Sequence, residues 1–361
     1  MRTLRGIKIE GFKSIESAEL ELGDLNVVIG ANGSGKTNLI GVFRLLESVL
    51  SRRLHSYVAE EPDRFLFHGR EITPELLLEF VFEEFTYRFR LKVVQRKLIL
   101  DEIRVKLSGN LSINPSGEEQ FIYECLDSSE SKLEELESRN ESIKFVFFQL
   151  RNLVVYHFHD TSDSSPARRM ADINDNRFFR RDAANLPAYL YWLKQKHSVA
   201  FRHIEEHVQL VAPFFECFVL EPFKNNERKI NLEWRHKGSD AYFDAWSLSD
   251  GTLRFICLAT LLLQPSPPAL ILLDEPELGL HPFAIRILAE MLETASEKSQ
   301  VILATQSVTL LDNFAPQNVI VAENDGLRTT FKRLDEEKLK VWLEEFSIGE
   351  LWEKNVLGGQ P

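Results

Sequence analysis

The stretch of sequence that decides the fold is Val27-Val28-Ile29-Gly30-Ala31-Asn32-Gly33-Ser34-Gly35-Lys36-Thr37. It runs from an apolar, strand-like segment into a helix-like one, and its two outer glycines precede Lys-Thr in the P-loop pattern. Glycines let successive backbone N–H groups curl around a phosphate, and the N-terminus of the following helix adds positive potential. The stretch therefore predicts a site for the phosphates of a nucleotide.

Two side chains of this loop have specific chemistry. Lys36 can reach the β- and γ-phosphates, and the Thr37 hydroxyl can ligate Mg²⁺. We therefore expect ATP and Mg²⁺ as the bound groups. The residues of the loop that we expect to bind the nucleotide are Asn32, Gly33, Ser34, Gly35, Lys36, Thr37 and Asn38.

The composition is that of an ordinary globular protein. The chain has 361 residues, of which 44% are hydrophobic and 27% charged, enough for one large domain or two interlocked lobes. The net charge of −12 argues against a broadly basic surface that coats DNA, although it leaves room for a local basic groove.

The sequence gives no sign of export or of a membrane span. The N-terminus continues into strand-like alternation without a signal peptide, and the apolar run Phe255 to Leu263 is too short to cross a bilayer. Cys125, Cys217 and Cys257 are scattered and form neither a disulfide framework nor a metal spacing. We expect reduced thiols, a cytoplasmic location and no membrane partner.

The order of strands and helices indicates an α/β fold with a mainly parallel sheet. An apolar strand over Leu25 to Ile29 delivers the P-loop, and a helix follows Thr37. From Ala269 onward, buried strands alternate with helices, which is typical of βαβ units. Those strands are expected at Leu270–Leu273, Val301–Ala304 and Val319–Ala322.

Between Glu71 and Cys125 the apolar residues recur with period two, which predicts an antiparallel meander. One of its strands carries a basic stripe, Arg88, Arg90 and Lys92. Two interpretations remain open: these residues pair with acidic residues of the neighbouring strand, or they contact nucleic acid.

Two further segments also leave alternatives open. The segment Phe145 to Phe158 is apolar and aromatic, and a strand there would point the side chains of His157 and His159 to one side. His203 and His207 lie four residues apart on a predicted helix, so the two pairs together could form a metal site. No acidic residues at a ligand spacing accompany them. An arginine-rich stretch could hold phosphates or tie lobes together through Asp172, Asp175 and Asp182; its members are Arg168, Arg169, Arg177, Arg180 and Arg181. Later segments predict helices at Leu186–Lys196 and Val199–Val211 and a strand through Ile230, Leu232 and Trp234.

Three later motifs fit the P-loop in order. The strand at Leu270 ends in Asp274-Glu275, where Asp274 would hold Mg²⁺ and Glu275 would polarise the attacking water. Leu248-Ser249-Asp250-Gly251-Thr252 opens a helix, so that the hydroxyl of Ser249 and the N–H of Gly251 suit a γ-phosphate. Gln306 follows the next apolar strand, at the place of a switch residue near the γ-phosphate.

With these motifs the chain resembles the RecF/OLD/SMC-type branch of ABC ATPases, and most closely the stand-alone AAA-type ATPases of bacteria. The resemblance implies an ABC-type P-loop head with a mainly parallel core sheet, an antiparallel β lobe and a small helical lobe. It implies that Lys13 and Ser14 lie near the nucleotide and that Gln149, His159 or Asp160 takes the Q-loop position. The domains expected are an N-terminal ATPase lobe (1–158), a helical and signature lobe (159–265) and a C-terminal part of the core (266–361).

The resemblance also implies a mechanism. Two copies would close as an ATP-dependent homodimer, in which each triphosphate lies between one P-loop and the partner's Ser249 and Gly251. Lys36 would stabilise developing charge, Glu275 would orient water, and Gln306, where the family often has His, would hydrogen-bond water or the γ-phosphate. Only 85 residues separate Ser162 from Leu248, too few for coiled-coil arms, and no nuclease module follows the switch.

Two roles remain open at this level. The first is a DNA-linked ATPase in repair or anti-phage defence, with DNA as a partner and a nuclease supplied in trans. The second is an ATP-gated interaction module that restrains or releases a partner toxin or nuclease without acting on DNA. The variant signature and the large meander disfavour the ATPase subunit of a membrane transporter.

Overall fold

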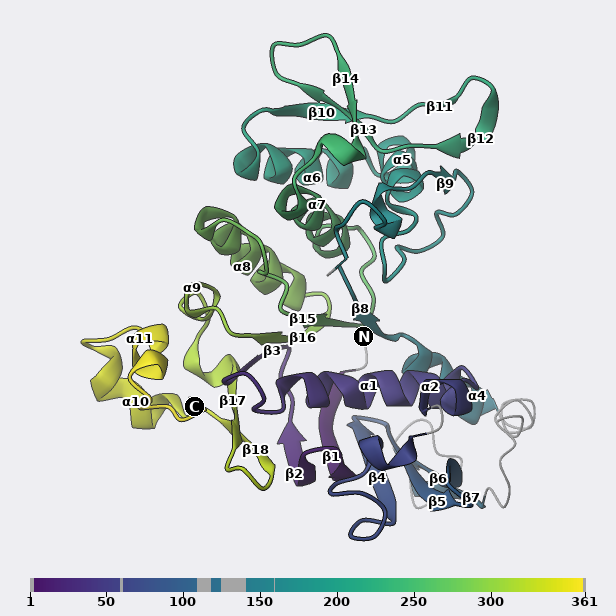
Figure 1. Ribbon diagram of the computed structural model, residues 1–361, viewed down its shortest axis with the longest axis vertical. Coiled ribbons are helices and arrows are strands. Elements are labelled where there is room, and N and C mark those ends of the chain that lie inside the picture. The colour runs from purple at the N-terminus through teal and green to yellow at the C-terminus, as the bar shows by residue number, and fades with distance from the viewer. Residues whose placement is uncertain (1–2, 59–60, 109–117, 125–140, 159, 360–361) are drawn as a thin grey trace.

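The computed structural model describes residues 3–58, 61–108, 118–124, 141–158 and 160–359, with residues 118–124 described by their backbone alone. Figure 1 shows two sheets separated by one long helix, with a second group of helices and short strands above the central sheet. In the described segments no helix is both long and apolar enough to cross a membrane.

The central sheet has six strands in the order β18-β17-β3-β16-β15-β8, all parallel except β18. Their bounds are β3 Leu25–Ile29, β8 Leu153–Tyr156, β15 Leu270–Asp274, β16 Gln300–Thr305, β17 Val319–Asn324 and β18 Thr329–Arg333. The inner strands β3 and β16 are buried along their whole length because helices cover both faces of the sheet. Alternate residues of one strand therefore belong to different cores: Val27 and Ile29 face one, and Val28 faces the other.

The register of the parallel strands determines where the polar motifs meet. Asp274 of β15 lies opposite Ala304 of β16, and Thr305 of β16 lies opposite Ile29 of β3. The carboxyl ends of parallel strands share one edge of a sheet. The P-loop, the acidic pair and the switch segment therefore leave the central sheet at the same edge.

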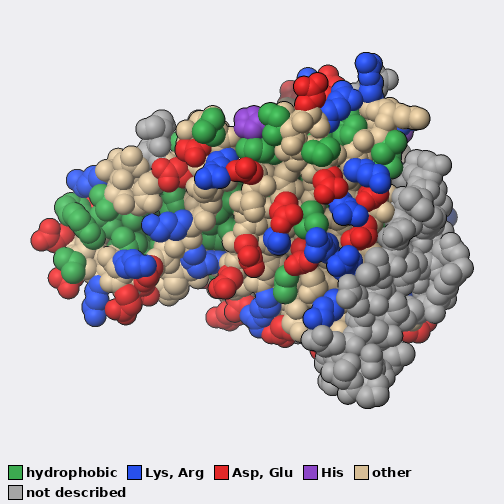
Figure 2. Space-filling view, turned by 90° about the horizontal axis from the view of Figure 1, so that it is seen from below, with side chains coloured by type: hydrophobic (Ala, Val, Ile, Leu, Met, Phe, Trp, Pro, Cys, Tyr) green, Lys and Arg blue, Asp and Glu red, His purple; other side chains and the backbone are tan. Residues whose placement is uncertain are grey.

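The second sheet is an antiparallel meander in the order β2-β1-β4-β5-β6-β7. Its strands are β1 Leu4–Phe12, β2 Ile15–Glu21, β4 Glu75–Phe82, β5 Phe85–Val94, β6 Lys97–Ser108 and β7 Glu118–Glu124. The prediction of cross-strand pairing is confirmed, because Arg88 lies 3.9 Å from Glu79, Arg90 lies 2.9 Å from Asp101, and Lys92 also pairs with Asp101. Figure 2, seen from below Figure 1, shows acidic and basic side chains interspersed on this face.

Helix α1, Lys36–Leu50, lies between the two sheets (Figure 1). Its apolar residues join one core with Val28 of the central sheet and Phe80 of the meander, where the ring centroids of Phe43 and Phe80 are 5.8 Å apart. Helices α2, Leu54–Val58, and α4, Glu141–Arg151, flank it. Burial on both sides fixes the helix whose N-terminus follows the P-loop.

The helical lobe covers the opposite face of the central sheet. Its helices are α5 Leu186–Lys196, α6 Ser198–Val211, α7 Asp250–Leu262 and α8 Pro282–Ser296, and α9 Val308–Leu311, α10 Glu336–Leu343 and α11 Ile348–Glu353 follow near the C-terminus. Two small sheets complete the lobe: β10 Phe215–Val219, β13 Glu233–His236 and β14 Tyr242–Asp244 form one, and β9 Ala171–Asp172, β11 Pro222–Phe223 and β12 Asn226–Ile230 form the other. The 3₁₀ helices are η1 Pro62–Phe65, η3 Pro166–Arg168, η4 Ala245–Ser247 and η5 Pro316–Asn318.

Two details of the sequence prediction are wrong. The segment Phe145 to Phe158 is a helix followed by a strand, and β8 ends at Tyr156, so His157 lies beyond the strand. The predicted strand through Ile230 and Trp234 is broken, because β12 and β13 pair in different sheets. Buried residues at both ends of the break imitate a single alternating strand.

Candidate functional site

The P-loop closes tightly at the end of β3. Lys36 is buried, and its Nζ donates to the carbonyls of Gly30 at 2.6 Å and Ala31 at 2.8 Å. Gly35 has φ of 103°, and a Cβ there would lie 2.4 Å from the Oγ1 of Thr329. Among the described residues the buried hydroxyl of Ser34 has no hydrogen-bond partner. A loop with an unsatisfied polar group and a folded-back lysine is arranged to receive a polar ligand.

A chain of hydroxyl and amide groups supports the loop from behind. Asn38 Nδ2 donates to Ser14 Oγ at 2.7 Å, Ser14 Oγ is hydrogen-bonded to Thr329 Oγ1 at 2.7 Å, and Thr329 Oγ1 donates to the carbonyl of Ser34 at 3.0 Å. This brings Ser14, which the resemblance places near the nucleotide, into contact with the P-loop helix. Thr329, fully buried on β18, is a supporting residue that the sequence analysis missed.

Lys13 adjoins the same region. Its Nζ lies 5.5 Å from the ring centroid of Phe12 and 5.6 Å from that of Phe65. Burial, and then the charge of Arg44, lower the pKa of Lys13. Lys13 and Asn38 both line an open cavity of about 740 Å³ next to the start of α1.

The acidic pair stands at the adjacent strand end. Glu275 has φ of +42°, which is unusual for a residue with a side chain, and its N–H donates to the carbonyl of Ala304 at 2.8 Å. Gln306 Nε2 donates to Glu275 Oε1 at 2.5 Å. The structure therefore joins the candidate general base and the candidate switch residue directly. A strained backbone held by the neighbouring strand is a feature of functional sites.

A third carboxylate, Glu277, was not singled out from the sequence. It is buried, and its Oε1 accepts from the hydroxyl of Thr305 at 2.5 Å and from the N–H of Gln306 at 3.4 Å. Burial raises the pKa of Glu277, and the hydrogen bond from Thr305 opposes that shift. Glu277 thereby fixes the backbone from which Gln306 projects.

Electrostatics connect the P-loop with these carboxylates. Burial lowers the pKa of Lys36, whereas the charges of Glu275, Asp274 and Glu277, in that order, raise it. Asp274 also lies 3.7 Å from Arg44 of α1. One ammonium group and three carboxylates that interact electrostatically at one sheet edge match the charge arrangement of a metal–triphosphate site.

The signature segment lies at the start of α7, in the helical lobe (Figure 1). Ser249 is its exposed N-cap residue, and its Oγ accepts from the N–H of Thr252 at 3.2 Å. At Gly251 a Cβ would lie 2.5 Å from the carbonyl oxygen of Gly279. Only glycine therefore allows α7 to approach the loop that follows the acidic pair.

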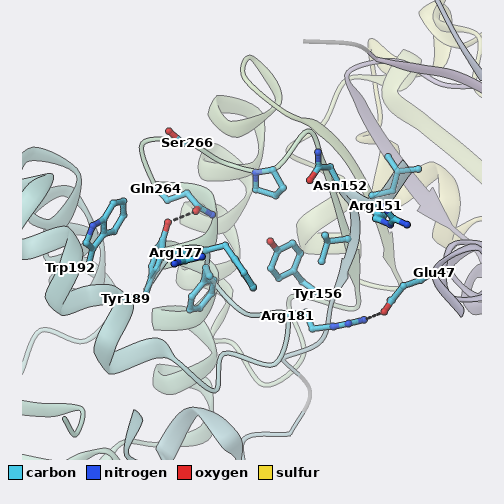
Figure 3. A pocket seen from close by; sticks show the side chains of 15 residues that line it. Glu47, Arg151, Asn152, Tyr156, Arg177, Arg181, Tyr189, Trp192, Gln264 and Ser266 are labelled. Atoms are coloured by element: carbon cyan, nitrogen blue, oxygen red, sulfur yellow. Dashed lines mark hydrogen bonds and ion pairs between the residues drawn. The ribbon is translucent and has the colours of Figure 1, made fainter. Parts of the chain in front are cut away.

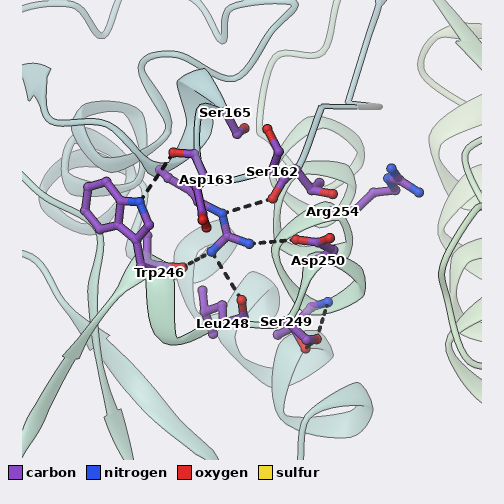
Figure 4. A network of polar contacts seen from close by, with 12 residues as sticks. Ser162, Asp163, Ser165, Trp246, Leu248, Ser249, Asp250 and Arg254 are labelled. Atoms are coloured by element: carbon purple, nitrogen blue, oxygen red, sulfur yellow. Dashed lines mark hydrogen bonds and ion pairs between the residues drawn. The ribbon is translucent and has the colours of Figure 1, made fainter.

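Arg168 holds this segment in place, and Figure 4 shows the polar network around Leu248, Ser249 and Asp250. The Arg168 side chain is 3% exposed; Nη2 donates to Asp250 at 2.8 Å, Nη1 to the carbonyls of Leu248 and Ala245, and Nε to the carbonyl of Thr161 at 3.0 Å. This arginine thus ties the segment before α5 to the signature through Asp250 and backbone carbonyls. It does not act through Asp172, Asp175 or Asp182, the aspartates named in the prediction; of these, Asp175 forms an ion pair with Arg180.

Residues 25–312 match the model of a family described as "AAA domain, putative AbiEii toxin, Type IV TA system". The chain belongs to this family. No curated protein matches the chain.

The fold of this family member is similar to solved heads of SMC proteins. One is an Smc head bound to the C-terminal winged-helix domain of ScpA, with 14% identity, a TM-score of 0.58 and coverage of 94% of this chain and 99% of the other. A second, from Pyrococcus furiosus, is an Smc head with an extended coiled coil, bound to the C-terminal domain of ScpA; it has 16% identity, a TM-score of 0.58 and coverage of 96% and 99%. A third, from Pyrococcus yayanosii, has 14% identity, a TM-score of 0.51 and coverage of 96% and 99%. The chain thus has the ABC-type head fold of SMC proteins within a P-loop ATPase family.

The remaining candidates are the three possible Q-loop residues and the histidines of the imagined metal site. Of the Q-loop candidates, Gln149 lies on α4, Asp160 accepts from the N–H and hydroxyl of Ser162, and His159 lies outside the described residues. His207 Nδ1 is hydrogen-bonded to the carbonyl of His203. Within the described ranges, which do not include His159, no group of three or more His, Cys, Asp or Glu side chains could hold a metal ion.

One contact near Asp274 had no signal in the sequence. His157 lies directly after β8, and its ring Nδ1 is 3.3 Å from Arg44 Nη2. The backbone N–H of His157 donates to the backbone carbonyl of Arg181 at 2.9 Å. The Arg181 side chain forms an ion pair with Glu47 of α1. The arginine-rich stretch therefore reaches the helix of the P-loop.

Proposed function

We propose that this chain is an ATP-hydrolysing head that dimerises around ATP and Mg²⁺. The observation that carries the proposal is that β3, which precedes the P-loop and Lys36, and β15, which ends at Asp274-Glu275, end at the same edge of the central sheet. The charges of these carboxylates also oppose the lowering of the Lys36 pKa by burial. The division into residues 1–158, 159–265 and 266–361 is part of this proposal, with the signature in the middle unit.

The residues suit the triphosphate and its metal. In the part of the chain that the structure describes, the buried hydroxyl of Ser34 has no partner, and Thr37 is exposed at the start of α1. Asp274 would supply an oxygen ligand to the metal. Lys36 would leave its two carbonyl partners and bind the β- and γ-phosphates, while Lys13, Ser14 and the residues Asn32 to Asn38 would hold the nucleotide. Mg²⁺ would neutralise charge on the phosphates when bound.

Hydrolysis needs an oriented water molecule. Glu275 would accept a hydrogen bond from that water and direct its attack on the γ-phosphate, and Gln306, bonded to Glu275, would hold the carboxylate or the water in position. Removing one preorganised stabiliser of this kind costs about 3–4 kcal/mol of activation free energy.

The signature supports closure by a second copy. Ser249 and Asp250 are exposed, and Ser249 presents a helix N-terminus to solvent while Arg168 holds the loop rigid. A rigid, exposed N-terminus that carries a hydroxyl suits the γ-phosphate bound by another subunit. The homodimer would thereby contain two composite sites.

What the ATP cycle drives is a choice between two roles. One is a DNA-linked ATPase in repair or anti-phage defence that works with a nuclease in trans. The second candidate is an ATP-gated module that controls a partner toxin or nuclease. The net charge of −12, the ion-paired Arg88 and Arg90, and the toxin–antitoxin description of the family favour the second.

The test is the ATPase rate of wild type and Glu275→Gln, each with and without duplex DNA. We expect turnover by wild type and a loss of at least about 100-fold in Glu275→Gln. Stimulation by DNA would support the DNA-linked role, whereas a rate indifferent to DNA would support the interaction module. Equal turnover by the two proteins would refute the proposed site.

A further inference from the structure

A second cavity lies outside the nucleotide site. It has a volume of about 440 Å³ and is bounded by edge strand β8, helix α5, the segment before α5 and the connection from α7 to β15 (Figure 3). None of its lining residues belongs to the P-loop, the acidic pair or the signature. The volume lies within the range of about 300–1,000 Å³ that small-molecule sites occupy.

Aromatic side chains form one wall of this cavity. The rings of Tyr189 and Trp192, both on α5, have centroids 5.3 Å apart, and Tyr156 of β8 lies across from them (Figure 3). Tyr189 is fixed, because its hydroxyl donates to Gln264 Oε1 at 2.7 Å. Burial raises the pKa of Tyr189 to about 12, which keeps this donor protonated at neutral pH. Tyr156 and Tyr189 are buried and Trp192 is half-buried, and aromatic rings that line a cavity suit a planar aromatic ligand.

Positive charge lies at the rim. Arg151, Arg177 and Arg181 line the cavity, and Glu47 is the carboxylate among the lining residues. This local excess of arginine contrasts with a chain whose net charge is −12. Within the described part of the chain Arg177 makes no ion pair, and it is exposed. Guanidinium groups from different segments around one cavity are suited to bind a phosphate.

We propose that this cavity binds a free mononucleotide, a planar heteroaromatic base that carries a phosphate. The base would stack beside Trp192 and Tyr189, and the phosphate would bind Arg177 together with Arg151 or Arg181. The cavity volume accommodates one nucleotide unit, and the acidic chain disfavours a long polyanion.

The cavity is also connected to the proposed ATP site. Arg181 pairs with Glu47 of α1, and its carbonyl accepts the N–H of His157 at 2.9 Å. His157 Nδ1 lies 3.3 Å from Arg44 Nη2, and Arg44 lies 3.7 Å from Asp274. A phosphate that draws Arg181 from Glu47 would act on the candidate metal ligand through this chain. The regulatory part rests on the proposed function, whereas the binding part does not.

The experiment is a calorimetric titration of the full chain with AMP and UMP after the P-loop has been filled with AMP-PNP and Mg²⁺. We expect a Kd below about 1 mM and weakening of roughly tenfold or more in Arg177→Gln. Arg202→Gln, an exposed arginine of α6 that does not line the cavity, is the matched control and should bind as wild type does. Adenosine and inorganic phosphate alone should each bind at least roughly tenfold more weakly.

Three results would overturn the proposal. They are no binding of either mononucleotide, equal binding by Arg177→Gln and wild type, and Arg177-dependent binding of a single-stranded oligonucleotide without binding of mononucleotides. Because the readout is binding and Arg177 lies outside the P-loop, a chain without ATPase activity would still test it. A change in ATPase rate on adding UMP, absent in Arg177→Gln, would support the connection to Asp274, and an unchanged rate in wild type would refute that connection.

Discussion

Replacing Arg168 with Met should loosen the signature segment without deleting it. The Arg168 side chain is 3% exposed, and its guanidinium donates to the buried carbonyls of Thr161, Ala245 and Leu248 as well as to Asp250. Methionine fills a similar volume but offers no donor, so the three carbonyls lose their partner.

The structure gives the expected magnitude. Each unsatisfied buried carbonyl costs about 1–3 kcal/mol of unfolding free energy. The ion pair with Asp250 contributes about 0–1 kcal/mol, because the Asp250 side chain is 67% exposed. Because the surrounding chain relaxes partly, we expect the three carbonyls together to lower the unfolding free energy by about 3–5 kcal/mol. With an unfolding entropy of about 0.8 kcal/mol per kelvin for 361 residues, the melting temperature should fall by about 4–7 °C.

The assay is thermal unfolding followed by circular dichroism, with Arg169→Met as the matched control. Arg169 is the adjacent arginine and is exposed, so its replacement should leave the melting temperature within about 1 °C of wild type. If Arg168→Met and Arg169→Met have the same melting temperature, the Arg168 network does not hold the signature and the reasoning fails. A second expectation is that ATP-dependent dimerisation weakens in Arg168→Met and not in the control.

Two further predictions concern the P-loop and the buried carboxylate. Gly35→Ala should lower the melting temperature by at least about 3 °C more than Gly33→Ala. A Cβ at Gly35 would lie 2.4 Å from Thr329, whereas among the described residues a Cβ at Gly33 would have no neighbour within 4 Å and would cost only about 1–2 kcal/mol of backbone strain. Equal melting temperatures of the two variants would contradict the close approach of Gly35 to Thr329. Because burial raises the pKa of Glu277 above its ordinary value of 4.5, the stability that its protonated form contributes is lost as pH rises through the raised pKa. Glu277→Gln, which cannot ionise, should therefore gain stability relative to wild type in urea unfolding as the pH rises above 4.5, the ordinary pKa of glutamate. A stability difference independent of pH would refute this assignment.

The sequence predicted the elements whose signal is local. The run Leu25–Ile29 is apolar because both faces of β3 are covered, and the glycines after it permit only a phosphate loop or a similar turn. The acidic pair followed from the same logic at the end of β15. These segments carry their structural reason within about ten residues.

The residues that were missed act over long sequence distances. Thr329 supports the carbonyl of Ser34 from 295 positions away, and a threonine on an edge strand has no sequence pattern that indicates this role. Arg168 stood out in an arginine-rich stretch, but its partners are carbonyls about 80 residues away, chosen by tertiary packing. The break between β12 and β13 was missed because buried residues on both sides keep the alternation of one strand.

The central claim is that the P-loop and Glu275 act on one triphosphate held between two copies of the chain. The most direct measurement is the mass of Glu275→Gln in solution by light scattering, with ATP and Mg²⁺ and without them. The variant should be monomeric alone and a stable dimer with ATP, and the added substitution Ser249→Arg should abolish the dimer. A Glu275→Gln protein that stays monomeric at saturating ATP would contradict the claim.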